Sequence, residues 1–516
     1  MPEGTSRTAG ASIACSLLMS ATLVLTGCAV GPDFATPAPP DRKDYTAEPL
    51  GSHTAGARTD AKTDAKATGG ESQRFVRDLD LPGQWWTLFH SKPLNSLVET
   101  ALAASPDIAA AQAALRAAKE NLYAQQGALL PTLDANVGAI RQQPAIGAPS
   151  DAGTDAPTFN LFTGQLNVSY TPDVFGGTRR SIEALAAQAD QQRFQLEATY
   201  LTLTSNLAGA AVQEASLRSQ IAATQRIIKI ETDVLDLLRR QRALGQVAEA
   251  DVAAQEAALA QVQQTLPLLQ KQLAQQRDLL AALSGGFPSD RLTQRFELAA
   301  LRLPRDLPVS LPSQLVAQRP DIRAASANLQ SASAQIGVAI ANRLPNITLT
   351  ATTGSTALAV DQLFTSGTGF WSAAGAVTQP IFHGGTLLHR ELAAKATFDQ
   401  AAAQYRGTVI TAFQNVADAL RAIQSDAVAL QRAVAFERAA ARSLDIARQR
   451  LTLGDINYIG LLTAQQTYQQ ALINLAQAKA SRYADTVALF QALGGGWWNR
   501  SDVEPDRPLT VVDFLQ

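Results

Sequence analysis

The sequence is poor in the residues that build most metal and redox sites. Its 516 residues include 2 cysteines and 4 histidines, and none of these is spaced as in a CxxC or HExxH motif. We therefore expect neither a zinc site nor a cysteine nucleophile. The glycine pair at Gly176 also lacks the lysine and hydroxyl residue of a phosphate-binding loop, so a turn into a helix is the simpler interpretation. The sequence predicts no catalytic residue, no metal, no cofactor and no enzymatic activity.

Charged and aromatic residues are also scarce. Charged residues make up 17% of the chain and aromatic residues 6%, against a charged fraction of roughly 25% in typical soluble domains. The hydrophobic share of 46% depends heavily on alanine, which favours helix walls over a compact core of large side chains. Lys+Arg 43 against Asp+Glu 45 gives a net charge of −2. This balance argues against a nucleic-acid partner.

Long apolar runs are absent except near the N-terminus. Residues 11–26 form an apolar stretch shorter than the about 20 residues of a membrane-spanning helix, and it resembles the core of a signal peptide. The stretch ends in Leu25-Thr26-Gly27-Cys28, which resembles a bacterial lipobox. We predict that residues 1–27 are removed and that Cys28 carries a covalent lipid, palmitate included. The alternative is an ordinary signal peptide with a coincidental cysteine.

Residues 28–80 are rich in Pro, Ala, Thr, Gly, Asp and Lys. A segment of this composition does not bury a core of its own, so the sequence predicts a flexible, lipid-anchored tether. No further run of 18 or more apolar residues follows. If the protein spans a membrane, it must do so with β-strands.

The body of the chain consists of two similar sequence repeats. Residue pairs coincide in order at offsets between 208 and 214, a period far longer than that of solenoid repeats. We therefore expect a duplicated half, with the first repeat over residues 105–300, a linker over 301–318 and the second repeat over 319–496. The matching pairs are Pro106/Pro320, Asp107/Asp321, Leu130/Leu344, Pro131/Pro345, Gly176/Gly384, Gly245/Gly454 and Gly285/Gly495.

Each repeat predicts the same elements. A short helix over 106–129 or 320–343 is followed by two segments that alternate polar and apolar residues with the period of a β-strand. A long helix over 178–243 or 386–452 comes next, with a sustained heptad seam in the second copy. A helix then returns to about residue 285 or 494. At 1.5 Å per residue the long helix measures about 100 Å, so the two shorter helices can stack end to end beside it.

The predicted strands have one apolar face and one face of hydroxyl and amide side chains. This pattern is typical of a transmembrane barrel with lipid outside and water inside; a sandwich packed on its own helices is the alternative. Four strands cannot close a barrel, because the smallest have about eight. The barrel interpretation therefore requires an oligomer, a dimer or, for a water-filled pore, a trimer of twelve strands.

These features together resemble the TolC-like outer-membrane efflux proteins, and within them the lipid-anchored OprM/NodT branch. The resemblance rests on the order of several segments along nearly the whole chain. They are Cys28-Ala-Val-Gly-Pro-Asp-Phe34, Trp85-Trp86-Thr-Leu-Phe89, Tyr170-Thr-Pro-Asp-Val-Phe-Gly-Gly177, Arg319-Pro320-Asp321-Ile322, Gln379-Pro380-Ile381-Phe382 and Ala492-Leu493-Gly-Gly-Gly-Trp497.

The resemblance implies a mainly α fold with a transmembrane β part: a homotrimer with a 12-stranded barrel in outer-membrane lipid and a 12-helix tunnel through the periplasm. Residues 81–104 and 497–516 would be equatorial segments. It also implies docking to a periplasmic membrane-fusion adaptor and to an inner-membrane transporter of the RND type. The predicted function is the outer-membrane channel of a tripartite efflux system. A periplasmic adaptor or coiled-coil structural lipoprotein is the alternative, although neither needs two amphipathic hairpins. The sequence of such a channel does not identify the compound that it transports.

The resemblance further suggests two kinds of site residue. The turns at Leu244-Gly245 and Leu453-Gly454 lie at the helical end farthest from the strands, where the family's tips meet the adaptor. Plain helix capping by glycine is an alternative that does not exclude contact.

The family's entrance gate commonly has a Tyr, then a hydrophobic residue and, one turn on, an acidic residue. Here Tyr458 and Ile459 keep the first two positions and Thr463 replaces the acid. We predict that a ring of Ile459 side chains mainly closes the entrance. We also predict a weak preference for cations, because a ring of Thr463 hydroxyls produces a weaker negative electrostatic potential than a ring of carboxylates. Asp455 can replace the missing charge or can be a solvated residue of the cap.

Overall fold

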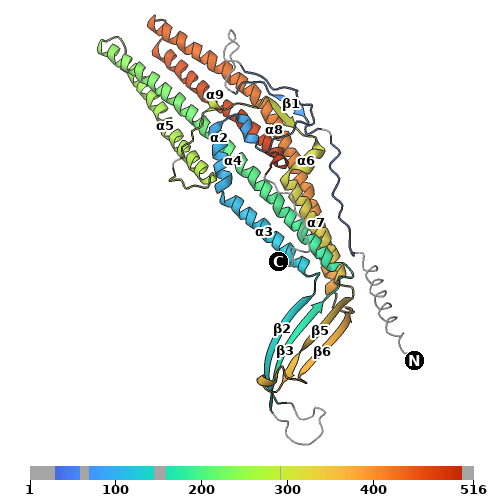
Figure 1. The fold of residues 1–516 in the computed structure, drawn as a ribbon. Helices are drawn as coiled ribbons and strands as arrows, with labels where there is room; N and C mark the ends of the chain where they lie inside the picture. The colour runs from blue at the N-terminus through green and yellow to red at the C-terminus, as the bar shows by residue number, and fades with distance from the viewer. Residues whose placement is uncertain (1–28, 43, 58–68, 144–157, 291, 502–516) are drawn as a thin grey trace, which may run out of the picture.

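The computed structural model describes residues 29–42, 44–57, 69–143, 158–290 and 292–501. Figure 1 shows an elongated body of helices with a β-sheet at one end and the turns between α4 and α5 and between α8 and α9 at the other. The predicted signal peptide, Cys28 and the tail beyond residue 501 lie outside the described residues. No helix in these described ranges is both long and apolar enough to cross a bilayer.

The duplication is visible as three pairs of helices with equal lengths. α3 (Pro106–Gly127) and α7 (Pro320–Ala341) have 22 residues each, and α4 (Gly177–Ala243) and α8 (Thr386–Thr452) have 67 each. α5 (Glu249–Leu283) and α9 (Tyr458–Ala492) have 35 each. The ends agree with the predicted helices to within about two residues. Pro267 lies inside α5, which continues past it.

The helices pack as the predicted lengths require. α3 and α5 lie along α4, α7 and α9 lie along α8, and α4 also packs against α7 and α9. The heptad seam predicted in α8 provides buried contacts, since Val409, Val416, Leu420, Ile423 and Leu430 are all buried. The helical body is therefore a single curved layer, with α3 and α5 at one flank and α8 at the other.

The four predicted strands form one antiparallel sheet. β2 (Thr132–Gln142), β3 (Phe159–Tyr170), β5 (Asn346–Ala357) and β6 (Gly369–Thr378) follow in that order. Directly paired residues share a face, and the register aligns apolar rows with apolar rows. One such row is Leu133, Val168, Ala351 and Ala373, and the neighbouring row on the opposite face is Asp134, Asn167, Thr352 and Ser372.

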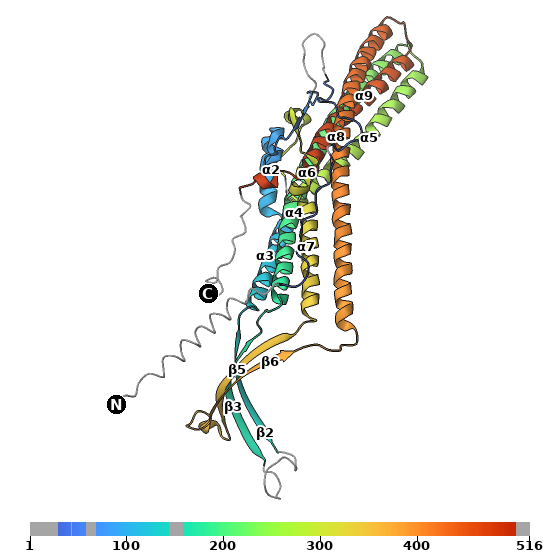
Figure 2. The ribbon, with the colours of Figure 1, turned by 90° about the vertical axis from the view of Figure 1, so that its right-hand side faces the viewer.

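The apolar face of this sheet does not pack on the helices. Val137 is 87% exposed and Trp371 80% exposed, and both side chains belong to that face by register. The sheet stands apart from the helical body (Figure 2). The sandwich alternative is therefore wrong. Among the described residues, the two outer strands, β2 and β6, have no strand paired to their outer edges.

The remaining elements gather around the middle of the helical body. β1 (Arg74–Arg77) pairs in parallel with β4 (Asp306–Val309), and α6 (Pro312–Gln318) follows β4. α2 (Lys92–Ala104) and the 3-10 helices η1 (Trp85–Phe89), η2 (Leu298–Ala300) and η4 (Trp497–Asn499) pack nearby, and η3 (Val360–Gln362) lies in the loop between β5 and β6. The predicted linker 301–318 is thus partly structured.

The predicted tether is wrong for most of its length. Residues 29–42, 44–57 and 69–80 run along the helical body instead of leaving it (Figure 1). Arg482 of α9, 1% exposed, donates hydrogen bonds to the carbonyls of Gly69 at 2.7 Å and Glu71 at 2.9 Å. It also reaches Gln73 Oε1 at 2.9 Å and Thr54 Oγ1 at 3.2 Å. Composition missed this because the segment is held through its backbone by a buried cation from a distant helix.

Candidate functional site

The two helix tips are built by the same glycine cap. Gly245 has φ +71° and Gly454 φ +76°, a left-handed conformation that favours glycine. In the first tip the amide of Gln246 donates to the carbonyl of Gln241 at 2.9 Å. In the second, the amide of Asp455 donates to the carbonyl of Arg450, also at 2.9 Å. Both turns are therefore Schellman caps, which explains the two glycines by helix termination.

Each cap places one leucine at the extreme end of the molecule. Leu244 is 73% exposed and Leu453 76% exposed, although leucine normally contributes to cores. Capping accounts for Gly245 and Gly454 but gives no reason for these leucines. An exposed apolar residue on each tip is consistent with a contact to another protein.

Ion pairs tie the two helices of the first tip together. Arg239 of α4 contacts Glu256 of α5 at 2.7 Å, and Arg242 of α4 pairs with Glu249 of α5. No sequence motif marks these four residues. The opposite charges at both positions were visible in the sequence, but their pairing depends on how α5 folds back on α4.

Tyr458 links the second tip to the first. It begins α9, and its hydroxyl hydrogen-bonds to the side-chain oxygen of Gln241 at the end of α4. Its ring packs against Leu235, Leu238 and Val252. Burial and the nearby charge of Asp251 raise the pKa of Tyr458, so the hydroxyl remains a donor at neutral pH. Gln241 is a partner that the sequence alone did not reveal.

Ile459 and Thr463 lie on one exposed face of α9, as their spacing of one turn predicts. Ile459 is 61% exposed, and the Thr463 hydroxyl donates to the carbonyl of Ile459 at 2.9 Å. The hydroxyl proton of Thr463 is thus used within the helix. The same exposed stripe continues through Gln466, Thr467 and Gln470. It contains no charged side chain.

Asp455 lies at the end of the α8 cap. Its carboxylate is 3.9 Å from Arg450 Nε, and both side chains are more than half exposed. The residue that caps the start of α9 is Asn457, whose side chain accepts from the amide of Gly460 at 3.1 Å. Asp455 is therefore a solvated residue beside an arginine, in the turn that precedes α9.

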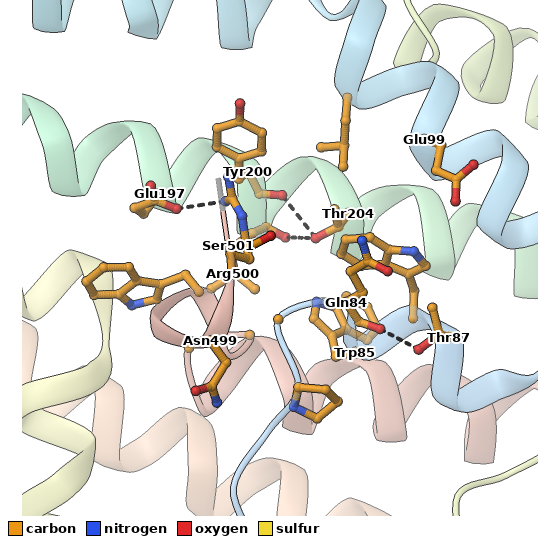
Figure 3. Close-up of a pocket in the computed structure, with 18 of the residues that line it drawn as sticks. Gln84, Trp85, Thr87, Glu99, Glu197, Tyr200, Thr204, Asn499, Arg500 and Ser501 are labelled. Atoms are coloured by element: carbon orange, nitrogen blue, oxygen red, sulfur yellow. Dashed lines mark hydrogen bonds and ion pairs between the residues drawn. The ribbon is translucent and has the colours of Figure 1, made fainter. Parts of the chain in front are cut away.

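A pocket of about 730 Å³ lies away from the tips, between η1, α2, α4 and the chain after η4. Figure 3 shows Arg500 directed at Glu197 within it, at 2.8 Å. The Arg500 guanidinium also stacks on the Tyr200 ring at 4.0 Å. The charges satisfy each other and fasten the C-terminal part of the chain to α4. We interpret this pocket as a structural junction.

A protein-family model described as "Outer membrane efflux protein" matches residues 97–286 and 311–495. The chain belongs to the outer membrane efflux protein family. It is 33% identical to the pyoverdine export outer membrane protein OpmQ of Pseudomonas putida, over 84% of this chain and 92% of the relative. It is 30% identical to the toluene efflux pump outer membrane protein TtgF of Pseudomonas putida, over 96% and 98% of the two chains.

Solved structures agree with this efflux-protein assignment. The outer-membrane channel OprN matches with a TM-score of 0.80 and 26% identity, covering 91% of this chain and all of that one. The outer membrane protein VceC of Vibrio cholerae matches with a TM-score of 0.76 and 26% identity, covering 81% and 100%. The expected TolC-like fold and the role as an outer-membrane efflux channel are confirmed. The adaptor alternative is wrong.

Proposed function

We propose that three copies of this chain form one continuous duct, the outer-membrane part of a tripartite efflux system. The observation that carries this proposal is the open four-stranded sheet with an outward apolar face. In lipid no strand edge stays unpaired, because each exposed backbone group costs several kcal/mol. Pairing β6 of one copy with β2 of the next satisfies both edges, and a head-to-tail contact of this kind closes into a ring.

The helical layer supports the same ring. α8 lies at one flank and carries a second set of apolar side chains that the single chain leaves exposed, among them Leu392, Ile410, Val428 and Ile446. α5 at the other flank exposes Leu268 and Leu279. Contact between α8 and the α3–α5 flank of a neighbour buries these residues. Each chain then contributes four strands and an equal share of the helical tunnel.

The native Trp371 offers a direct test of the membrane part. In liposomes of the full-length protein, we expect brominated lipids to quench Trp371, measured as the difference from Trp371→Phe. A trimer should also migrate on gels without heating and conduct ions in planar bilayers. Absence of Trp371 quenching in protein that is trimeric and inserted would contradict the outward apolar face.

We further propose that the tips dock with a periplasmic adaptor through Leu244 and Leu453, and that the adaptor joins the channel to an inner-membrane pump of the RND type. The double variant Leu244→Ser with Leu453→Ser should lower efflux in cells while leaving bilayer conductance unchanged. Leu130→Ser, at the opposite end of the helical body, is the matched control. Unchanged efflux in the double variant would contradict docking at these leucines.

We propose that the entrance is held closed by three Ile459 side chains, with Thr463 one turn further in. The neutral stripe on α9 supports weak ion selectivity. Three carboxylates at a narrow mouth attract cations far more than three hydroxyls, so Thr463→Asp should increase the cation preference of the conductance. Thr467→Asp, one turn deeper, serves as a comparison. Equal selectivity in wild type and Thr463→Asp would move the constriction elsewhere, with Asp455 as the next candidate.

The remaining parts of the proposal concern anchor and cargo. We propose that Cys28 carries the lipid anchor and that the protein has no enzymatic role. Mass spectrometry of the N-terminal peptide tests the lipid, which should be absent in Cys28→Ser. Relatives are named for the export of pyoverdine and the efflux of toluene and antibiotics. Such dissimilar cargoes support a passive duct whose specificity lies in the pump.

A further inference from the structure

Two segments that the sequence singled out separately meet in the structure. The first is the start of the described chain, Ala29 to Phe34, and the second is the turn Pro172 to Gly177 between β3 and α4. The amide of Val30 donates to the carbonyl of Phe175 at 3.1 Å. Figure 1 shows the N-terminal segment reaching the base of α4, where the sheet joins the helices. Residues about 145 positions apart thus form one contact.

Arg180, in the first turn of α4, holds the N-terminal segment in this place. Its side chain is only 6% exposed. The guanidinium donates to the carbonyl of Val30 at 3.1 Å, to the carbonyl of Gly31 at 3.4 Å and to the Asp33 carboxylate at 2.7 Å. Glu183 accepts at 2.7 Å and balances the buried charge. Two of these bonds go to backbone, so they fix the path of the chain rather than a particular side chain.

Glycines allow the segment to approach this closely. A Cβ on Gly31 would lie 2.5 Å from the Cα of Gly337 in α7, and Gly31 has φ +99°. A Cβ on Gly176 would lie 2.5 Å from the Cα of Ala29. Distances below 3.0 Å force atoms to shift. The backbone of the segment therefore lies in close contact with the backbone of both repeats.

We propose that Arg180, Gly176, Gly31 and Gly337 form a seat that fixes the lipid-bearing N-terminus at the junction of sheet and helices. This inference rests on the proposed anchor at Cys28. Cys28 directly precedes Ala29 in the sequence, so the seat adjoins the residue proposed to carry the lipid. The acyl chains then enter the bilayer beside the barrel wall. A free chain of about 50 residues would instead have a root-mean-square end-to-end distance of roughly 40 Å and would leave the anchor's position undefined. Arg180 acts as a positioning residue for the anchor.

Hydrogen exchange of the Val30 amide measures the seat in the full-length trimer. Arg180→Gln should speed exchange in the peptide that begins at Ala29 by about tenfold or more, since bonds to a charged group are lost. Gly31→Ala should do the same while Arg180 remains. Arg226→Gln, an exposed arginine of the same helix, is the control. Unchanged exchange in Arg180→Gln and in Gly31→Ala would overturn the seat.

A second measurement tests positioning rather than stability. Once Cys28 is acylated, Thr36→Cys supplies a single thiol for a nitroxide, and the three labels of a trimer report their mutual distance. The distance distribution should be narrow in the wild-type background, broad in Arg180→Gln and intermediate in Arg180→Lys. Equal widths in all three would overturn the proposal.

Failure of the seat and failure of the anchor give different results. Cys28→Ser, exported behind an ordinary cleavable signal peptide, should keep slow Val30 exchange, because the seat consists of protein contacts. Fast exchange in this variant would show that the lipid, not Arg180, holds the segment, and would overturn the proposal. An N-terminal peptide without acyl mass in the wild type would refute the anchor at Cys28 independently.

Discussion

The two helix tips have the same backbone and different side chains. An offset of 209 residues superimposes α4 on α8 and α5 on α9 along their whole lengths, and both turns use the same glycine cap. At the start of the returning helix, however, Glu249, Ala250 and Ala254 correspond to Tyr458, Ile459 and Thr463. The duplicated backbone therefore supports two unlike tips through a few substitutions.

The difference lies in what holds each tip together. In the first tip, ion pairs join Arg239 to Glu256 and Arg242 to Glu249 across the helices. In the second, α9 has no charged residue from Tyr458 to Ala478, and apolar contacts such as Leu444 with Leu461 hold it to α8. Apolar contacts are non-directional, so a shift of α9 against α8 at this tip breaks no ion pair between the two helices. If the proposed gate is at Ile459, we expect the second tip to be the one that moves during opening.

The largest effect is expected at Ile459, because the proposed gate lies on the second tip. Ile459→Ala should raise basal conductance severalfold and increase antibiotic leak into cells, since three apolar side chains leave the constriction. Leu237→Ala is the matched control, as Leu237 is 40% exposed on α4. Conductance unchanged in Ile459→Ala, together with loss of cation selectivity in Asp455→Ala, would place the gate at Asp455, in the turn between α8 and α9, instead of at Ile459.

The next-largest expected effect is a pH dependence of the protein's stability that arises from the second repeat. Asp426 and Asp485 stand where the first repeat has Leu217 and Gln276. Burial, and then the hydrogen bond and charge of Asp426, raise the pKa of Asp485 from 3.8 to about 7. The folded state keeps a proton that the unfolded state loses, so its stability should fall as pH rises from about 4 to about 7.

Substitution with the first-repeat residue checks this difference. Asp485→Gln should change the dissociation temperature of the trimer little at pH 4 and raise it at pH 8. Asp418→Gln, an exposed position on α8, should show no such trend. A wild-type dissociation temperature whose pH dependence equals that of Asp485→Gln would contradict the assignment.

A smaller effect is expected from the contact between the tips. Tyr458→Phe removes the hydrogen bond to Gln241 and should cost about 0.5–1.5 kcal/mol, seen as a modest rise in open probability. Because the pKa of Tyr458 is raised, the wild-type contact should persist below pH 10 and weaken only above it. Tyr468→Phe, further along α9, is the control. Identical gating in wild type and Tyr458→Phe would remove Tyr458 from the gate.

The smallest effect belongs to the first tip. Arg239→Gln breaks an exposed ion pair, which is worth about 0.2–1 kcal/mol and is screened by salt. We expect slightly faster hydrogen exchange at the α4–α5 turn in low salt, no difference in 1 M salt and unchanged conductance. A conductance increase as large as that of Ile459→Ala would show that both tips close the channel.

The sequence by itself determined the architecture. The order Pro106, Pro131, Gly176, Gly245 and its repetition set where each helix begins and ends, because proline and glycine act locally on the backbone. The alternation of strand residues, paired by register, determined which face of the sheet is apolar. These patterns have fixed periods along the chain, so they can be read without knowing what lies beside them.

Only the tertiary structure decided the contacts between distant segments. The predicted tether became a bound segment because Arg180 and Arg482 reach its carbonyls from α4 and α9. The packing of helices on one another brings Tyr458 to Gln241 and Asp485 to Asp426. A buried charge or hydroxyl needs a partner wherever the fold brings one, and that partner leaves no periodic signal in the sequence. Local periodicity therefore determines the elements, whereas the satisfaction of buried polar groups is settled in three dimensions.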